Sequence, residues 1–214
     1  MHDKTSYWYD PVQNSPAPYS QTDFKNYDSI IKKIINLIFH PQNFFKALPE
    51  EEKKGNALLI AIISGSLGMA AFIFWQGLFD LVLISESTDG SVSSWGYTVM
   101  ILIGSFFFPM VVIFQQFFLS ALIHLSLKLI KGGRLSFRQT FVIIAYGQAP
   151  LIWGIIPLIG GSLGLVWSVV VQIIGIKSVH RLSLGKSLLV FFLPVALIFV
   201  AFIILGVALS IVLE

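Results

Sequence analysis

The sequence predicts an all-α integral membrane protein, a polytopic bundle of five transmembrane helices with an N-terminal amphipathic helix at the membrane interface. Of its 214 residues 56% are hydrophobic and only 12% are charged, which is too apolar for a soluble globular protein. The apolar residues gather in long uncharged runs, and the basic residues flank those runs on one side of a single topology. These observations together define the fold class.

The N-terminal 48 residues divide into two parts. Residues 1–28 are polar and proline-rich without a helical period, so we expect a flexible cytoplasmic tail. In residues 29–48, the apolar and polar side chains from Ile30 to His40 separate into two arcs at about 100° per residue. Lysine on the polar arc is typical of a helix lying in the membrane interface. The same apolar arc could pack on the protein's own bundle, and the sequence leaves both alternatives open.

Residues 49–214 form the predicted five-span domain, whose first span is the uncharged run at 57–79. The second run, 97–127, would be about 46 Å long as a straight helix, against about 30 Å of hydrocarbon. Pro109 offers a point for splitting it into two spans. A split would move the following basic loop to the outside, so we predict one long, tilted helix, kinked at the proline.

The uncharged stretch 139–176 is flanked by basic residues at both ends, which requires an even number of crossings. We expect two short helices, 139–157 and 158–176, joined by an external turn near Pro157. Ser136 and Gln139 have the spacing of a capping box at the start of the first helix. The fifth span is predicted at 187–213.

The fourteen Lys and Arg residues set the predicted orientation. Basic residues that flank membrane spans stay on the cytoplasmic side. Five spans with the N-terminus inside and the C-terminus outside satisfy this rule at every position. The residues precede the first span or lie around two loops: Lys4, Lys25, Lys32, Lys33, Lys46, Lys53 and Lys54, then Lys128, Lys131, Arg134 and Arg138, then Lys177, Arg181 and Lys186.

The sequence offers no arrangement of groups suited to catalysis, so we predict a non-enzyme with no catalytic, cofactor-binding or metal-binding residues. It contains no cysteine, and no metal-ligand spacing, paired-carboxylate or nucleophile motif is present. His124 and His180 are interpreted as polar residues at the headgroup level. Chemistry on lipids by His180 with Arg181 is the enzymatic alternative. The net charge of +3 is concentrated at span ends, which does not favour nucleic-acid binding.

Polar residues inside the spans suggest an alternative function. Asp80 is the only acidic residue near a span, which makes it a candidate polar membrane residue. Five glutamines in the spans are predicted to form hydrogen bonds between helices. The alternative is a transporter or channel for small solutes or ions that uses Asp80 and these amides. The glutamines are Gln76, Gln115, Gln116, Gln148 and Gln172.

Small residues recur every fourth position in two of the predicted spans. Such stripes let helices approach closely, either within one bundle or between copies of the chain. We favour packing within the bundle and keep self-association as an alternative. The stripes are Ala57, Ala61 and Gly65 in the first span, and Gly160, Gly164 and Ser168 in the fourth.

The motifs Tyr146-Gly147-Gln148-Ala149-Pro150 and Pro157-Leu158-Ile159-Gly160, followed by Trp167 and the segment from Gly175 to Ser183, resemble the Yip domain family. These are polytopic membrane proteins whose eukaryotic members bind Rab-type GTPases in vesicle trafficking. The resemblance extends over about residues 37–212, a span judged by eye. It marks a set of candidate motif or packing positions: Tyr146, Gly147, Pro150, Pro157, Gly160, Gly164, Trp167, Gly175 and His180.

The resemblance implies five spans, a cytoplasmic N-terminus and a non-enzymatic role in organising membrane or binding partner proteins. The long N-terminal region and the Asp-Leu-Tyr-Gly-Pro motif of eukaryotic members are not present, so the chain is more similar to the short prokaryotic members. This implies the bacterial cytoplasmic (inner) membrane, or the endoplasmic reticulum or Golgi if the chain is eukaryotic. The expected partners are the lipid bilayer and other membrane proteins, with a small GTPase only if the eukaryotic role extends here. The candidate cytoplasmic contact residues are Lys131, Arg134, Arg138 and Arg181.

Overall fold

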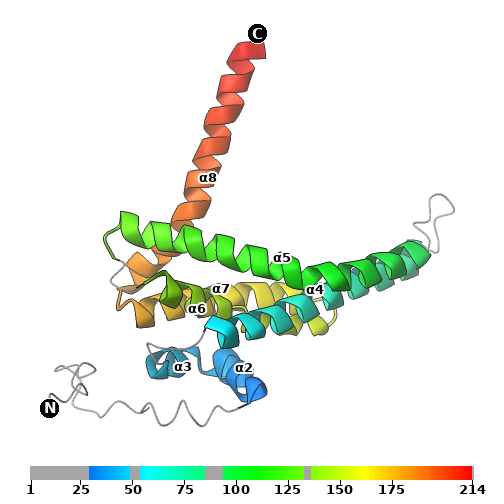
Figure 1. Cartoon of the computed structure of the whole chain (residues 1–214). Coiled ribbons are helices and arrows are strands. Elements are labelled where there is room, and N and C mark those ends of the chain that lie inside the picture. The colour runs from blue at the N-terminus through cyan, green and yellow to red at the C-terminus, as the bar shows by residue number, and fades with distance from the viewer. Residues whose placement is uncertain (1–28, 49–53, 85–93, 133–135, 214) are drawn as a thin grey trace.

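The structure is a computed structural model that describes residues 29–48, 54–84, 94–132 and 136–213 (Figure 1). Every regular element in these ranges is helical, which confirms the all-α fold class. The predicted tail at 1–28 lies outside the described residues. The elements are α2 (Ile30–Phe39), α3 (Pro41–Ala47), α4 (Lys54–Ile84), α5 (Ser94–Leu129), α6 (Phe137–Tyr146), the 3₁₀ helix η2 (Ala149–Ile155), α7 (Gly160–Val179) and α8 (Leu184–Leu213).

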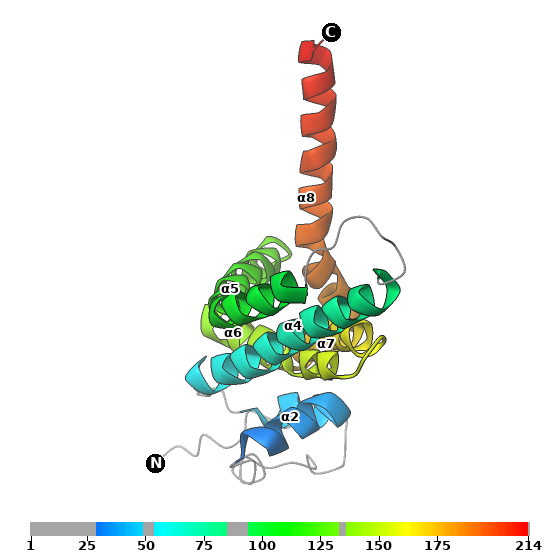
Figure 2. The same cartoon turned by 90° about the vertical axis from the view of Figure 1, so that its right-hand side faces the viewer.

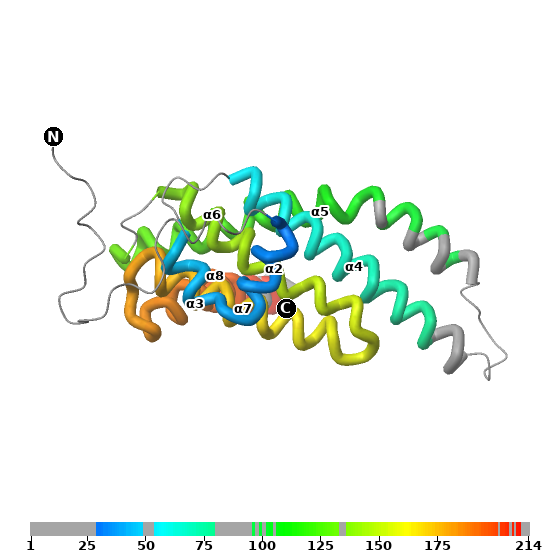
Figure 3. The backbone as a smooth tube through the Cα atoms, turned by 90° about the horizontal axis from the view of Figure 1, so that it is seen from below, coloured from blue at the N-terminus to red at the C-terminus, as the bar shows by residue number. Residues whose placement is uncertain are grey.

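Four helices in the described part are long and apolar enough to cross a membrane: Lys54–Phe79 in α4, Phe106–Leu129 in α5, Gly160–Val179 in α7 and Leu184–Leu205 in α8. The chain is therefore a polytopic helical membrane protein, while a total of five spans stays a prediction. The axes of α4, α5 and α7 are roughly aligned with one another (Figures 1 and 3).

Helices α4 and α5 are antiparallel neighbours (Figure 1). The α5 helix continues through Pro109 without a break. Its buried positions recur every three or four residues, so one stripe faces the bundle while most of the other described side chains are exposed, as expected of a lipid-facing surface. The stripe consists of Phe108, Val112, Gln116, Ser120, Ile123 and Leu127, and Ser126 is buried beside it.

The segment predicted as one helix at 139–157 is instead divided into α6 and η2. The physical reason is Pro150, which has no N–H and whose ring would collide with the carbonyl four residues earlier, at Tyr146. The α-helix ends at that residue, and the chain continues as a 3₁₀ helix. At the start of α6 the Ser136 N–H donates to Oε1 of Gln139 at 2.9 Å, the reciprocal bond of a capping box.

The 3₁₀ helix η2 packs backbone to backbone between α4 and α7. A methyl group added to Gly68 of α4 would overlap the Leu151 carbonyl oxygen, and one added to Gly154 would lie 2.7 Å from the Gly68 carbonyl oxygen. On the other side, a methyl group on Gly164 of α7 would lie 2.7 Å from the Pro150 carbonyl oxygen. Small residues therefore allow a short irregular segment to sit between two long helices.

Helices α2 and α3 pack on the side of the bundle rather than extending away from it (Figures 1 and 2). Phe44 is fully buried and makes edge-on ring contacts with Phe45 and Tyr146. Ile34, Leu37 and Ile38 of α2 are also buried. The segment 29–48 thus contacts the protein's own bundle, one of the two alternatives that the sequence left open.

Helix α8 leaves the bundle at the end where α5 and α7 end, and runs steeply away from the other long helices (Figures 1 and 2). Its base is anchored by Ser187 and Val190, which are fully buried. Beyond Pro194 its described side chains are exposed and almost entirely apolar. A helix that is apolar all round is suited to contact with lipid.

Candidate functional site

A buried polar seam runs through the half of the bundle where α5 ends and α6 begins. Its α5 side is formed by Gln116, Ser120 and His124, which lie four residues apart on one face. Nε2 of Gln116 donates to the Phe141 carbonyl of α6 at 3.0 Å and to Oγ of Ser120 at 3.1 Å. Gln116 therefore joins two helices at a depth where water is scarce.

The seam also supplies hydrogen-bond partners to the residues between α6 and η2. Nε2 of Gln148 donates to Oε1 of Gln116 at 2.8 Å, and Oγ of Ser168 in α7 donates to the Gly147 carbonyl at 2.8 Å. Nε2 of Gln172 donates to Oγ of Ser168 at 3.1 Å. Irregular backbone at membrane depth requires such partners. The Gln116–Gln148 bond links two elements, as predicted for the glutamines, whereas Gln172 bonds within its own helix.

At the end where α5 and α7 terminate, the seam connects three elements through one hydroxyl. Oγ1 of Thr140 lies 3.1 Å from Nδ1 of His124 and 3.3 Å from Nε2 of His180. A hydroxyl can donate one hydrogen bond and accept two, so which ring nitrogen donates and which accepts depends on the tautomers of the two histidines. His180 is 98% buried within the protein, and its position at the headgroup level stays a prediction.

The environment of His180 opposes a positive charge on its ring. Burial, and secondarily the neighbouring His124, lowers the pKa of His180 from 6.5 to about 4. Its buried Nδ1 has no hydrogen-bond partner among the described residues. At neutral pH the ring is therefore uncharged.

We expect the stability of the protein to fall on acidification between pH 6.5 and pH 4. Across this window the unfolded chain binds a proton at position 180 and the folded chain does not, so stability is lost as the pH falls. The lowered pKa corresponds to a loss of about 3 kcal/mol by pH 4. Thermal unfolding in detergent at pH 7.5 and 4.5 measures it. His180→Gln should remove a large part of the acid sensitivity, and His40→Gln, on an exposed residue, should leave it intact. Equal sensitivity in all three proteins would contradict the prediction.

The predicted motif positions mostly converge on the junction of α6, η2 and α7. Tyr146, Gly147, Pro150, Gly160 and Gly164 are buried in or beside it, whereas His180 is buried at the other end of α6, near Thr140. Gly175 lies where a methyl group would be 2.9 Å from the Phe45 ring, and the indole N–H of Trp167 donates to the Ile38 carbonyl at 2.7 Å. Pro157 is exposed, in the turn before α7. Their role as functional residues stays a prediction.

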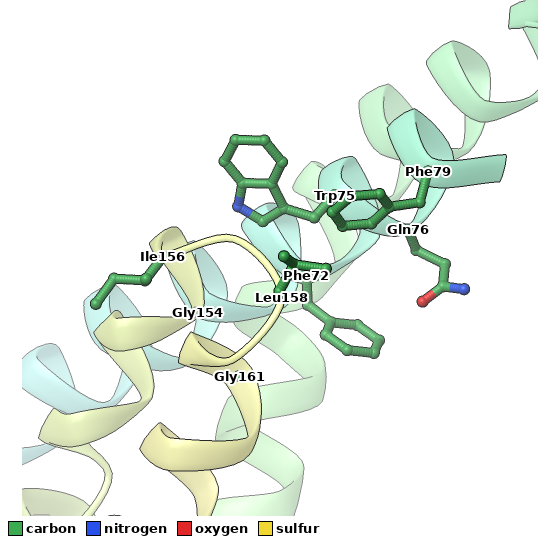
Figure 4. A pocket seen from close by; sticks show the side chains of 8 residues that line it. All are labelled: Phe72, Trp75, Gln76, Phe79, Gly154, Ile156, Leu158 and Gly161. Carbon is green, nitrogen blue, oxygen red and sulfur yellow. The ribbon is translucent and has the colours of Figure 1, made fainter. Parts of the chain in front are cut away.

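On the opposite side from the histidines, the turn after η2 rests against α4. The indole N–H of Trp75 donates to the Ile155 carbonyl at 3.0 Å. Figure 4 shows Trp75 and Phe72 beside this turn, with the Gln76 side chain directed away from it. Gln76 and Gln115 are exposed, so neither belongs to the buried seam. Asp80 lies in α4, four residues after Gln76.

The cytoplasmic contact candidates lie around two loops of matching geometry. Lys131 and Arg181 each follow the end of a long helix and each have φ of 52°. In both loops the N–H of the following residue donates to the carbonyl five residues earlier in the chain. Gly132 donates to Leu127 at 3.0 Å, and Leu182 donates to Lys177 at 3.1 Å. Arg138 is half-buried in the first turn of α6, and Arg134 lies outside the described residues.

Sequence reasoning missed Ser120 and Thr140 in the seam, and the glycine contact of Gly68 with η2. A signal existed for α5, because Gln116, Ser120 and His124 follow a spacing of four residues in an otherwise apolar helix. Thr140 had no such signal. Its importance arises from the two histidines, which lie 16 residues before it and 40 residues after it in the chain.

The fold and the seam define an integral, polytopic helical membrane protein whose interior polar groups mostly serve helix packing. Comparison with known families extends this assignment. The family model for the Yip1 domain matches residues 35–205, and the chain belongs to this family. No curated protein and no solved structure gives a significant match.

Proposed function

We propose that this protein organises membrane or partner proteins at the cytoplasmic face without catalysing a reaction. The observation that carries the proposal is the pair of basic loops beside the ends of α5 and α7. A methyl group on Gly132 would lie 3.2 Å from the Leu182 side chain, so the two loops touch. The charges of Lys131 and Arg181 therefore belong to one surface.

This surface suits an acidic partner. Lys128 and Lys177 lie in the last turns of the same two helices, adding positive charge at the same rim. Positive charge at this position also attracts anionic headgroups, so lipid and an acidic protein surface satisfy the same chemistry. Membership of the Yip1 domain family supports a binding role over a catalytic one.

Crosslinking in native membranes tests the proposal. A photoreactive residue at position 131 should give discrete protein adducts that Arg181→Glu removes. The same probe at position 199, on the exposed face of α8, should give a pattern that Arg181→Glu does not alter. Only lipid adducts at position 131, unaffected by the charge reversal, would contradict partner binding there.

Flux and turnover assays separate the alternatives. Ion or solute flux in proteoliposomes that Asp80→Asn abolishes would favour transport. Turnover of phospholipids or nucleotides that His180→Ala abolishes would favour an enzyme. We expect neither activity from the purified protein.

A further inference from the structure

The end of α7 connects the buried His180 ring to the contact between the two basic loops. The N–H of His180 donates to the Ile176 carbonyl at 3.0 Å and ends the helix. Arg181, with φ of 52°, then turns the chain out of the helix, and the next residue, Leu182, meets Gly132 of the other loop. Only one residue therefore separates the buried ring from the place where the loops touch.

Two other helices hold the His180 ring in place. Its Nε2 lies 3.3 Å from Oγ1 of Thr140 in α6, and the same hydroxyl lies 3.1 Å from Nδ1 of His124 in α5. The residue is almost completely buried. Because α5, α6 and the end of α7 share this one cluster, displacement of the ring moves the end of α7 relative to the other two helices.

The second nitrogen of the His180 ring is unsuited to the charged form. Nδ1 is buried and has no hydrogen-bond partner among the described residues. A neutral imidazole has a single N–H, whereas the protonated ring has one on each nitrogen. From either neutral tautomer, protonation therefore leaves a charged N–H at Nδ1 for which the described residues offer no acceptor. Burial of an unsatisfied donor is costly, and more so when the group is charged.

The helices around the ring provide no negative charge to offset a proton on His180. The elements that pack against α7 are α2, α3, α6, η2 and α8, and α5 joins them through His124. Within their described bounds these elements and α7 contain no Asp or Glu. The Lys, Arg and His side chains of these elements and of the two loops are Lys32, Lys33, His40, Lys46, His124, Lys128, Lys131, Arg138, Lys177, Arg181 and Lys186.

We propose that His180 is a pH-sensitive switch: protonation of its ring breaks the cluster with Thr140 and His124 and separates the two basic loops. The ring keeps its buried place only while it is uncharged. When it moves out, Leu182 leaves Gly132, because only Arg181 lies between the ring and that contact. A divided basic surface no longer presents its charges to one partner, so acid releases the partner. The inference adds regulation to the proposed partner-binding surface and rests on that proposal, although loop separation itself requires no partner.

The pKa of His180 sets the direction and the size of the effect. In the closed state, with the loops in contact, burial and secondarily His124 lower the pKa from 6.5 to about 4. In an open state the exposed ring regains its ordinary value. The open state therefore binds the proton more readily and gains population as the pH falls from 6.5 toward 4. The ratio of open to closed protein should rise about 30-fold between pH 7.5 and pH 5.

Distance measurements between two spin labels test the switch in the full chain. The protein has no cysteine, so Leu129→Cys and Leu184→Cys, at exposed positions on either side of the loop contact, can be labelled alone. A longer distance should appear at pH 5 and disappear on return to pH 7.5. In His180→Gln, whose amide can still bond to Thr140 but does not take up a proton, the distance should not depend on pH. The matched control, His40→Gln on an exposed histidine, should respond as the wild type does.

A second label pair separates the switch from general unfolding. Labels at the exposed positions Leu67 of α4 and Phe114 of α5 should keep their distance at pH 5. If this pair lengthened together with the loop pair, or if the loop pair did not respond in the wild type, the proposal would be wrong. An unchanged pH response in His180→Gln would equally overturn it.

A variant of the hydroxyl gives a test that does not require replacing His180. Thr140→Val removes the group that holds the neutral ring, so its loops should separate at a higher pH than those of the wild type. Separation at the same pH would contradict the cluster as the closing contact. No partner is present in these measurements, so they succeed or fail independently of the protein adducts at position 131.

Discussion

Gly68→Ala will destabilise the protein, whereas the same substitution at Gly55 in the same helix will be neutral or stabilising. Alanine is intrinsically better than glycine in a helix by about 1 kcal/mol. At Gly55 no atom lies within 4 Å of the added methyl group, so the helix can gain up to that amount. At Gly68 the methyl group would overlap the Leu151 carbonyl oxygen, which is backbone and cannot rotate away.

Overpacking of this kind costs about 1–3 kcal/mol, which exceeds the propensity gain. The expected result is a lower unfolding temperature in detergent for Gly68→Ala and an equal or higher one for Gly55→Ala. Gly68→Leu should lower it further by separating α4 from η2. If both alanine variants raised the unfolding temperature, the close crossing of α4 and η2 would be wrong.

Phe44→Ala will detach α2–α3 from the bundle, and Phe39→Ala will not. Phe44 is fully buried against Phe45 and Tyr146, and loss of such a ring costs about 3–5 kcal/mol. Phe39 is 65% exposed, so its loss leaves the packing of α2 unchanged. A free hairpin would expose the buried side chain at position 47.

Maleimide labelling of a cysteine introduced at Ala47 measures this detachment. Ala47 is 5% exposed, and cysteine differs from alanine by one sulfur atom. Labelling should be slow in the parent and Phe39→Ala proteins and fast in Phe44→Ala. Slow labelling in all three proteins would show that the hairpin is held by other contacts, with Trp167→Phe the next variant to examine.

Local sequence signals were sufficient for the elements that depend on near neighbours. The run from Ile30 to Phe39 is helical because its apolar and polar side chains separate at the helical period. Ser136 and Gln139 begin α6 because a capping box needs only residues three apart. The long apolar runs predicted α4, α5 and α8, because the thickness of the hydrocarbon core sets a minimum length for a span and each run meets that length by itself.

The interpretation of 139–157 as a continuous helix was wrong in one respect, although its cause was present in the sequence. Pro150 ends α6 at Tyr146, and the remaining residues form a 3₁₀ helix. Length and apolarity alone suggested an unbroken span. A proline breaks a helix, but a partner that stabilises the break comes from elsewhere: Ser168, which lies 21 residues from the Gly147 carbonyl that it binds.

By itself the sequence determined the membrane class, the positions of the long helices, the family resemblance and the basic character of the loops after α5 and α7. Each of these depends on composition or on spacing within one segment. The tertiary structure alone decided that His124 and His180 share Thr140, that η2 lies against Gly68, and that α2 docks beside Trp167. These are contacts between distant segments. They form only when apolar helices pack, because packing selects which polar atoms and which small residues meet.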